Sequence, residues 1–418
     1  MEPLRQASYR QLWLGQGASA FGEGMVPLAV AFATLRITNG SPTLLGLVLG
    51  AAAAAQTVAL PLGGVLGDRL PRPAVMVIAC WVRVVAQTGL AALVLAGRAQ
   101  VWELIVAMLA NGLASALFRP AATAVVPSVV SPTRLQPANA LIALSRSTSQ
   151  VCAPLLSGVL VAALDPGWAL AAAAVTFVVA AVSLGRLHLP RIAGSDRPGM
   201  WFELAAGLRE IAARPWYLSN LAAHAMGNLA IATFLVLGPV IASRSSHGST
   251  TWGLISASIA VGSVLGGVVA FRVLPRRPLV IANLAVTIAA LQMVALAHSV
   301  PTPVIMATAV AGFAGTSFLN RVWATVMQQL IPISVLARVS SYDWALSLAA
   351  MPVGYALGGA AAGWIGVPQT LTIAALVLAL PNALIVLTPG VQAVRRLSDG
   401  TVAGPAARGQ RSPAGDPS

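Results

Sequence analysis

Long apolar stretches follow one another through almost the whole chain, and only short polar segments separate them. The hydrocarbon core of a membrane is about 30 Å thick and needs roughly 20 apolar residues for each helix that crosses it. Twelve stretches reach that length and together use most of the 418 residues. Only 9% of the residues are charged, too few to cover a water-soluble protein of this size. The sequence therefore predicts an all-α membrane protein with twelve transmembrane helices.

The predicted helices are joined by short turns, except after the sixth helix, where the longest connection runs from Pro190 to Pro215. We place the helices near 11–35, 43–67, 74–97, 101–118, 138–163, 168–188, 216–242, 252–273, 278–298, 303–320, 340–364 and 369–388. The predicted organisation is an N-terminal six-helix bundle (1–190), a cytoplasmic linker with an amphipathic helix (191–215), a C-terminal six-helix bundle (216–390) and a disordered cytoplasmic tail (391–418).

All 25 basic residues are arginines, and most of them fall in connections on one side of the predicted bundle. Only Arg36, Arg98 and Arg244 fall in connections on the other side. The positive-inside rule makes the arginine-rich side cytoplasmic. We therefore expect a multi-pass protein of a bacterial inner membrane with both termini in the cytoplasm. The net charge of +14 follows this topology, so we expect no nucleic-acid partner.

The two halves of the chain resemble each other weakly. The segment 64–69 (GVLGDR) closes the second predicted helix, and 267–272 (GVVAFR) closes the eighth, at an offset of 203 residues. Pro154 in the fifth helix and Pro352 in the eleventh are 198 residues apart. Duplication of a six-helix unit is typical of transporters that work by alternating access. We therefore expect two six-helix pseudo-repeats.

The segment GVLGDRLPR resembles the signature that the major facilitator superfamily carries between its second and third helices. The residues that match are Gly64, Leu66, Asp68, Arg69 and Arg72. This resemblance implies the major facilitator fold and a cytoplasmic gate, in which the aspartate latches the two halves near the start of the eleventh helix. The alternative is a topogenic loop whose solvated charges contribute little.

Further segments resemble twelve-helix drug–proton antiporters of the macrolide-efflux and enterobactin-exporter type. They are Phe118–Ala121, Val126–Pro127, Ala138–Ala140, Arg338–Ser341 and Pro352–Gly354. This resemblance implies a secondary transporter that exports small amphipathic compounds, such as a drug or secondary metabolite, in exchange for protons. Two alternatives remain open. The same fold would carry one specific metabolite, such as a siderophore, or the chain would be a non-transporting sensor or scaffold.

Among the acidic residues, Glu23 is placed deepest in a predicted helix. Gln16, Ser19 and Glu23 follow one another at spacings of three and four residues and therefore share one helical face. Charges at membrane depth usually face a cavity or each other, so this face is the first candidate for a proton site. A structural salt bridge is the alternative, with Arg83 or Arg146 as the counter-charge.

Other polar residues within the predicted helices are candidates for the same central cavity. His224 and Asp343 are further candidates for proton coupling. The cavity-lining candidates are Gln16, Ser19, Asn111, Arg146, Gln150, Asn220 and Asn228. The sequence carries no nucleotide-binding loop, catalytic motif or metal-ligand spacing, so we expect no enzyme activity, no cofactor and no metal. The expected partners are a small-molecule substrate, protons and membrane lipid, and we expect a monomer.

Overall fold

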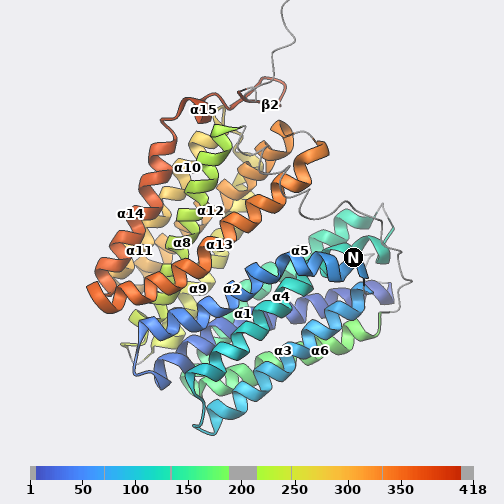
Figure 1. The fold of residues 1–418 in the computed structure, drawn as a ribbon, viewed down its shortest axis with the longest axis vertical. Coiled ribbons are helices and arrows are strands. Elements are labelled where there is room, and N and C mark those ends of the chain that lie inside the picture. Colours follow the sequence, from blue (N-terminus) through green and yellow to red (C-terminus); the bar gives the residue numbers. More distant parts are fainter. Residues whose placement is uncertain are drawn as a thin grey trace, which may run out of the picture.

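The computed structural model describes residues 6–69, 71–131, 134–187, 214–245, 247–331 and 333–405. These residues are almost entirely helical (Figure 1). The long helices are α1 (Ala7–Ile37), α2 (Pro42–Arg69), α3 (Arg72–Leu95), α4 (Val101–Val129), α5 (Leu135–Ala163), α6 (Pro166–Gly185), α8 (Pro215–Ala242), α9 (Gly248–Arg272), α12 (Thr302–Leu330), α13 (Ile333–Ile365) and α14 (Val367–Ile385). Between α9 and α12, α10 (Pro278–Thr287) and α11 (Ala289–Ala297) form one further span that is interrupted at Ile288. The described residues therefore contain the twelve predicted spans.

Ten of these spans are long and apolar enough to cross a membrane. The two that fall outside this set are α5 and α13, which contain 29 and 33 residues and are as long as the others. Polar side chains such as Ser149, Gln150 and the charged Arg146 interrupt the apolar sequence of α5. The fold is thus that of an all-helical, multi-pass membrane protein.

Three helices extend at least seven residues further than predicted, all toward the same end of the bundle. The fourth span continues from the predicted end at residue 118 to Val129, and the tenth from residue 320 to Leu330. The eleventh begins at Ile333, seven residues earlier than predicted. A proline such as Pro120 does not end a membrane helix when neighbouring groups satisfy the freed backbone carbonyl. This accounts for the extension of α4, whereas the added stretches of α12 and α13 contain no proline and continue the connections in which the sequence allows a helical extension.

The two halves pack their helices in the same way. In the first half α2 lies against α4, and in the second half α9 lies against α12. Both pairs approach closely at a glycine. A Cβ on Gly112 would lie 2.2 Å from the carbonyl oxygen of Ala52, and one on Gly266 would lie 2.1 Å from that of Ala314. Larger residues at these positions would push the paired helices apart.

Equivalent hydrogen bonds also join the first and third spans of each half. In the first half, Arg83 on α3 donates to the Ser19 hydroxyl on α1 at 2.9 Å. In the second half, Asn283 on α10 donates to the Asn220 side-chain oxygen on α8, also at 2.9 Å. The partners are separated by 64 and 63 residues, respectively. This correspondence supports the duplication expected from the sequence.

The halves touch at one end of the bundle and diverge toward the other, where the N-terminus lies (Figure 1). The contacts between them run along α2 with α13 and along α5 with α9. A Cβ on Gly46 would lie 2.3 Å from the carbonyl oxygen of Tyr355, and one on Gly158 would lie 2.6 Å from that of Ser249. In the first half, α3 and α6 lie on the side remote from the second half (Figure 1).

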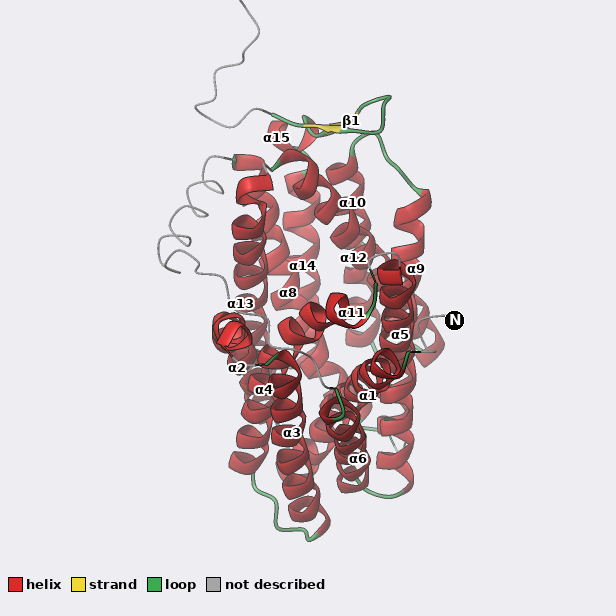
Figure 2. Ribbon diagram, turned by 90° about the vertical axis from the view of Figure 1, so that its right-hand side faces the viewer, coloured by secondary structure: helices red, strands yellow, loops and turns green. Residues whose placement is uncertain are grey.

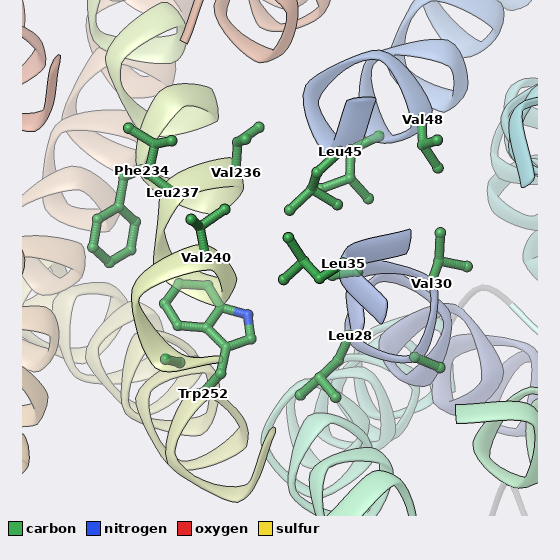
Figure 3. Close-up of a cluster of buried hydrophobic side chains, with 14 of the residues drawn as sticks. Leu28, Val30, Leu35, Leu45, Val48, Phe234, Val236, Leu237, Val240 and Trp252 are labelled. Atoms are coloured by element: carbon green, nitrogen blue, oxygen red, sulfur yellow. The ribbon is translucent and has the colours of Figure 1, made fainter. Parts of the chain in front are cut away.

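Buried apolar side chains fill the closed end. Figure 3 shows Leu35 and Leu45 of the first half facing Val240 of the second half, with Leu28 and Trp252 below them. Trp252 also packs against Phe234, with ring centroids 5.6 Å apart. Close packing of these side chains excludes water from this end of the bundle.

The segment after the last long helix is folded against the second half. It contains α15 (Pro389–Gln392) and two short antiparallel strands, β1 (Arg395–Arg396) and β2 (Val402–Ala403) (Figure 2). Val391, Val394 and Val402 are buried there. The prediction of a disordered tail is therefore wrong for residues 391–405. The apolar residues of this segment are buried against the second half. Residues 406–418 and the predicted amphipathic linker helix lie outside the described residues.

Candidate functional site

Charged and polar side chains join three helices in the middle of the first half. Glu23 on α1 forms an ion pair with the Arg83 guanidinium on α3. That guanidinium also donates to the hydroxyls of Ser19 at 2.9 Å and Ser115 on α4 at 2.8 Å. The Ser115 hydroxyl in turn donates to the carbonyl oxygen of Asn111 at 2.9 Å. Glu23 lies 16 residues from the start of α1, roughly 24 Å along the helix, so this network is at membrane depth.

The Arg83 side chain is fully buried. Its guanidinium carbon lies 5.4 Å from the ring centroid of Phe118 and 5.2 Å from that of Phe177, within the range of cation–π attraction. A buried charge is stable only when it is paired and hydrogen-bonded. Of the two arginines predicted as counter-charges for Glu23, Arg83 therefore forms the ion pair.

Arg119 is a second cation at this carboxylate, and the sequence does not predict it there. Its Nη2 lies 3.9 Å from Glu23 Oε2, and its side chain is 51% exposed. The predicted end of the fourth helix at residue 118 puts Arg119 in a connection. The apolar run Ala121–Val126 after Pro120 was the signal that the helix continues.

A pocket opens beside this network, between α1, α4 and α5. Its polar lining includes Gln16, Ser19, Glu23 and Arg146, and the remaining residues are Trp13, Gly17, Ala20, Phe118, Ile142 and Ser145. The Gln16 amide donates to the carbonyl oxygen of Ala122 at 3.2 Å, which fixes one wall to α4. The structure thus brings Glu23 together with three of the predicted cavity-lining residues, Gln16, Ser19 and Arg146. Asn111 contributes a main-chain oxygen to the network, and Gln150 is exposed on α5 outside the pocket lining.

The predicted residues of the second half lie in different surroundings. Asn220 is fully buried: its amide donates to the carbonyl oxygen of Trp216 at 2.7 Å, and its oxygen accepts from Asn283. It therefore packs α8 against α10 and does not line an opening in this conformation, contrary to the prediction. Asn228 donates to the carbonyl oxygen of Ser347 at 2.9 Å and joins α8 to α13.

His224 lies in an aromatic cluster of the second half. Its ring meets Trp323 edge-on, with ring centroids 5.0 Å apart. Trp323 also packs against Tyr217 and Trp216, at 5.0 and 6.0 Å between centroids. The His224 Nε2 atom is buried and has no hydrogen-bond partner among the residues that the structure describes. The imidazole of His224 therefore packs against aromatic rings and does not belong to the Glu23 network.

The gate motif is only partly visible. Gly64, Asp68 and Arg69 belong to the last turns of α2, and Arg72 is the first residue of α3. The side chains of the first three lie outside the described residues, as does that of Asp343 in α13. The latch and the alternative proton site at Asp343 therefore stay predictions.

The Major Facilitator Superfamily model matches residues 12–342 of this sequence. The chain belongs to the major facilitator superfamily. The enterobactin exporter EntS of Salmonella typhimurium (strain LT2) is 26% identical over 372 residues, which cover 87% of this chain and 86% of that protein. As a member of this superfamily, the chain is a secondary transporter of a small molecule and not an enzyme.

Solved transporter structures share the major facilitator fold seen here. A crystal structure of the peptide transporter POT superposes with a TM-score of 0.75 at 13% identity, covering 93% of this chain and 95% of that chain. The nucleoside transporter NupG superposes with a TM-score of 0.74 at 11% identity, covering 91% and 100%. At these identities the likeness defines the fold of this superfamily member and leaves its substrate open.

Proposed function

We propose that this transporter exports a small amphipathic compound from a bacterial cytoplasm in exchange for protons. The observation that carries the proposal is the environment of Glu23. Among the described side chains it is the acidic one in the middle of a membrane span, and it is 22% exposed on the pocket side. A carboxylate that reaches both a buried ion pair and an open pocket is suited to carry a proton between the two sides of a membrane.

A change of charge on Glu23 alters the whole network around it. When Glu23 takes up a proton, its attraction to Arg83 weakens, but the Arg83 guanidinium keeps its hydrogen bonds to Ser19 and Ser115. Protonation therefore loosens the contact of α1 with α3 and leaves the buried Arg83 charge with hydroxyl partners only, a higher-energy state that favours rearrangement of the network. Such a contact is a suitable element for coupling a proton to the rocking of one half against the other.

The proposed direction of transport is supported by one comparison. The arginine asymmetry favours a cytoplasmic N-terminus, but a carrier that works by alternating access opens to both sides, so this topology does not set the direction. Similarity to EntS, which is named an enterobactin exporter, favours export. The same similarity supports the second candidate, a transporter dedicated to one metabolite such as a siderophore. A reporter that is active only in the periplasm should stay inactive when it is fused after Arg396. Activity of this reporter would place the C-terminus in the periplasm and contradict the proposed orientation.

The gate motif completes the proposed cycle. When the open end closes, Asp68 at the end of α2 would meet the first turns of α13 and latch the halves together. Asp68→Asn keeps the shape and removes the charge, so it should reduce transport strongly and leave membrane insertion unchanged. If Asp68→Asn transports at the wild-type rate, Asp68 is only a solvated charge and does not latch the halves.

The coupling role of Glu23 is tested by Glu23→Gln in proteoliposomes with an imposed pH gradient. The glutamine mimics the protonated carboxyl, so uphill transport should be lost while passive exchange of a bound compound continues. Glu103→Gln is the matched control, because Glu103 caps the start of α4 and lies outside the pocket. Uphill transport with unchanged pH dependence in Glu23→Gln would move the proton site elsewhere.

A further inference from the structure

The surroundings of the pocket carry more positive than negative charge. Glu23 and Arg83 neutralise each other in their ion pair. Arg119 reaches Glu23 only at 3.9 Å and is 51% exposed. Arg146 lines the pocket and is exposed, and its guanidinium has no hydrogen bond or ion pair within the described part of the chain. One carboxylate thus faces three guanidinium groups, and two positive charges stay uncompensated.

Both uncompensated arginines lie well inside their helices. Arg119 is 18 residues from the start of α4, roughly 27 Å along the axis, and Arg146 is 11 residues from the start of α5, roughly 17 Å. A cation at such depth is costly unless water or an anion faces it. A pair of such cations beside one pocket is a feature that packing alone does not explain.

We propose that the substrate is an amphipathic organic anion, whose charged group binds at the exposed guanidinium groups of Arg119 and Arg146 beside this pocket. Guanidinium groups bind carboxylates and other oxyanions through paired, charge-assisted hydrogen bonds. The pocket itself has a volume of about 10 Å³, room for about one water molecule, so the apolar body of the substrate lies outside it. This inference rests on the proposed transport function and specifies its substrate class.

The charge distribution excludes the opposite class from this pocket. A cationic amphiphile would meet two uncompensated guanidinium groups and only one carboxylate, which is already paired. An organic anion also leaves a cell along the inside-negative membrane potential, with about a tenfold accumulation ratio for each 59 mV and each charge. Glu23 competes with such an anion for Arg119, so neutralising Glu23 should strengthen anion binding.

Three probes with the same apolar body test the substrate charge: 4-biphenylcarboxylate, 4-biphenylcarboxamide and 4-biphenylmethylammonium. Their binding to the purified full-length transporter is measured by calorimetry. We expect the carboxylate to bind at least tenfold more tightly than the carboxamide, and the ammonium probe to bind most weakly. Equal affinities, no binding of the carboxylate, or a preference for the ammonium probe would overturn the inference.

Variants test whether the two arginines cause the preference. Arg146→Gln and Arg119→Gln should each weaken carboxylate binding about tenfold and leave carboxamide binding unchanged, whereas Arg146→Lys should keep the preference. Glu23→Gln should strengthen carboxylate binding severalfold. Arg98→Gln, at an exposed arginine near the opposite end of the bundle, is the control. A carboxylate preference that both arginine variants retain would place the anion elsewhere and overturn the assignment.

Flux separates this inference from the proposed function. In proteoliposomes, a potential set with valinomycin should drive biphenylcarboxylate movement, and Arg146→Gln should reduce that movement. Flux of the neutral probe alone, driven by a pH gradient, would overturn the anion inference and uphold proton-coupled transport. Potential-driven carboxylate flux that is indifferent to a pH gradient would support the anion inference and contradict proton coupling.

Discussion

The first and second halves of this transporter share their helix packing but differ in the chemistry at equivalent positions. In the first half Arg83 binds Ser19 and, through the same guanidinium, the carboxylate of Glu23. In the second half the corresponding link joins two neutral amides, Asn283 and Asn220, both fully buried. The duplicated architecture thus keeps a polar link between the first and third spans, while an ion pair beside a pocket is present in the first half alone among the described residues.

At a depth comparable to that of the Glu23 network, the second half contains a cluster of aromatic side chains. Trp216, Tyr217, His224 and Trp323 pack edge to face, with ring centroids 5.0 to 6.0 Å apart. Such contacts are stabilising but carry no net charge. We infer that the first half provides the chemistry and that the second half acts mainly as a packed wall against which the first half moves.

The largest expected effect comes from removing the buried cation. Arg83→Met should destabilise the protein by about 3–5 kcal/mol, because it leaves the Glu23 charge without its counter-charge at membrane depth. The second substitution Glu23→Gln should restore most of this loss, since a neutral amide needs no counter-ion. Thermal unfolding of the purified protein in detergent measures both changes.

Arg36→Met is the matched control for that experiment. Arg36 forms an ion pair with Asp165 at the closed end, but its side chain is 48% exposed, so its loss should cost at most about 1 kcal/mol. If Arg83→Met and Arg36→Met lower the stability equally, the network around Glu23 is no more than an exposed ion pair, and the contrast between the halves disappears.

The number of spans and the polar face of α1 could be predicted from the sequence because each depends on local patterns. Apolar length gives a span, and spacings of three and four place Gln16, Ser19 and Glu23 on one face. The partner of Glu23 could not be chosen, because a single helix pattern does not say which helices touch. Arg83 on α3 and Arg146 on α5 are equal candidates in the sequence, and the folded chain shows that the Arg83 side chain reaches the carboxylate.

There are also physical reasons why the sequence misplaces some residues. Asn220 lies on a regular polar stripe, but a buried amide can face a neighbouring helix as well as a cavity, and the sequence does not distinguish these cases. Arg119 was missed because helix ends are read from proline and charge, both of which α4 tolerates inside the helix. The folded tail was missed because its burial depends on a surface formed by distant residues such as Gln329.

An intermediate effect is expected at the neutral link of the second half. Asn283→Ala should cost about 1–3 kcal/mol, because it leaves a buried oxygen of Asn220 without its donor. The double variant Asn220→Ala, Asn283→Ala should cost less than the sum of the two single changes, since each single change removes the same bond. Proton-coupled transport should keep its pH dependence in these variants, and a shift would show that the second half also titrates.

The smallest effect is expected where the tail packs on the second half. The described residues of the first half carry no equivalent segment. The Val402 backbone N–H donates to Gln329 Oε1 at 2.7 Å, and Arg396 N–H donates to the carbonyl oxygen of Arg276 at 2.9 Å. Gln329→Ala removes one of these bonds and should weaken the tail by about 1 kcal/mol, which corresponds to roughly fivefold more frequent local opening. Trypsin cleavage after the exposed Arg395 should accelerate by a similar factor, while global unfolding and Glu23-dependent transport stay unchanged. A matching change in transport would instead make the tail part of the moving machinery, and the second half could no longer be regarded as a passive wall.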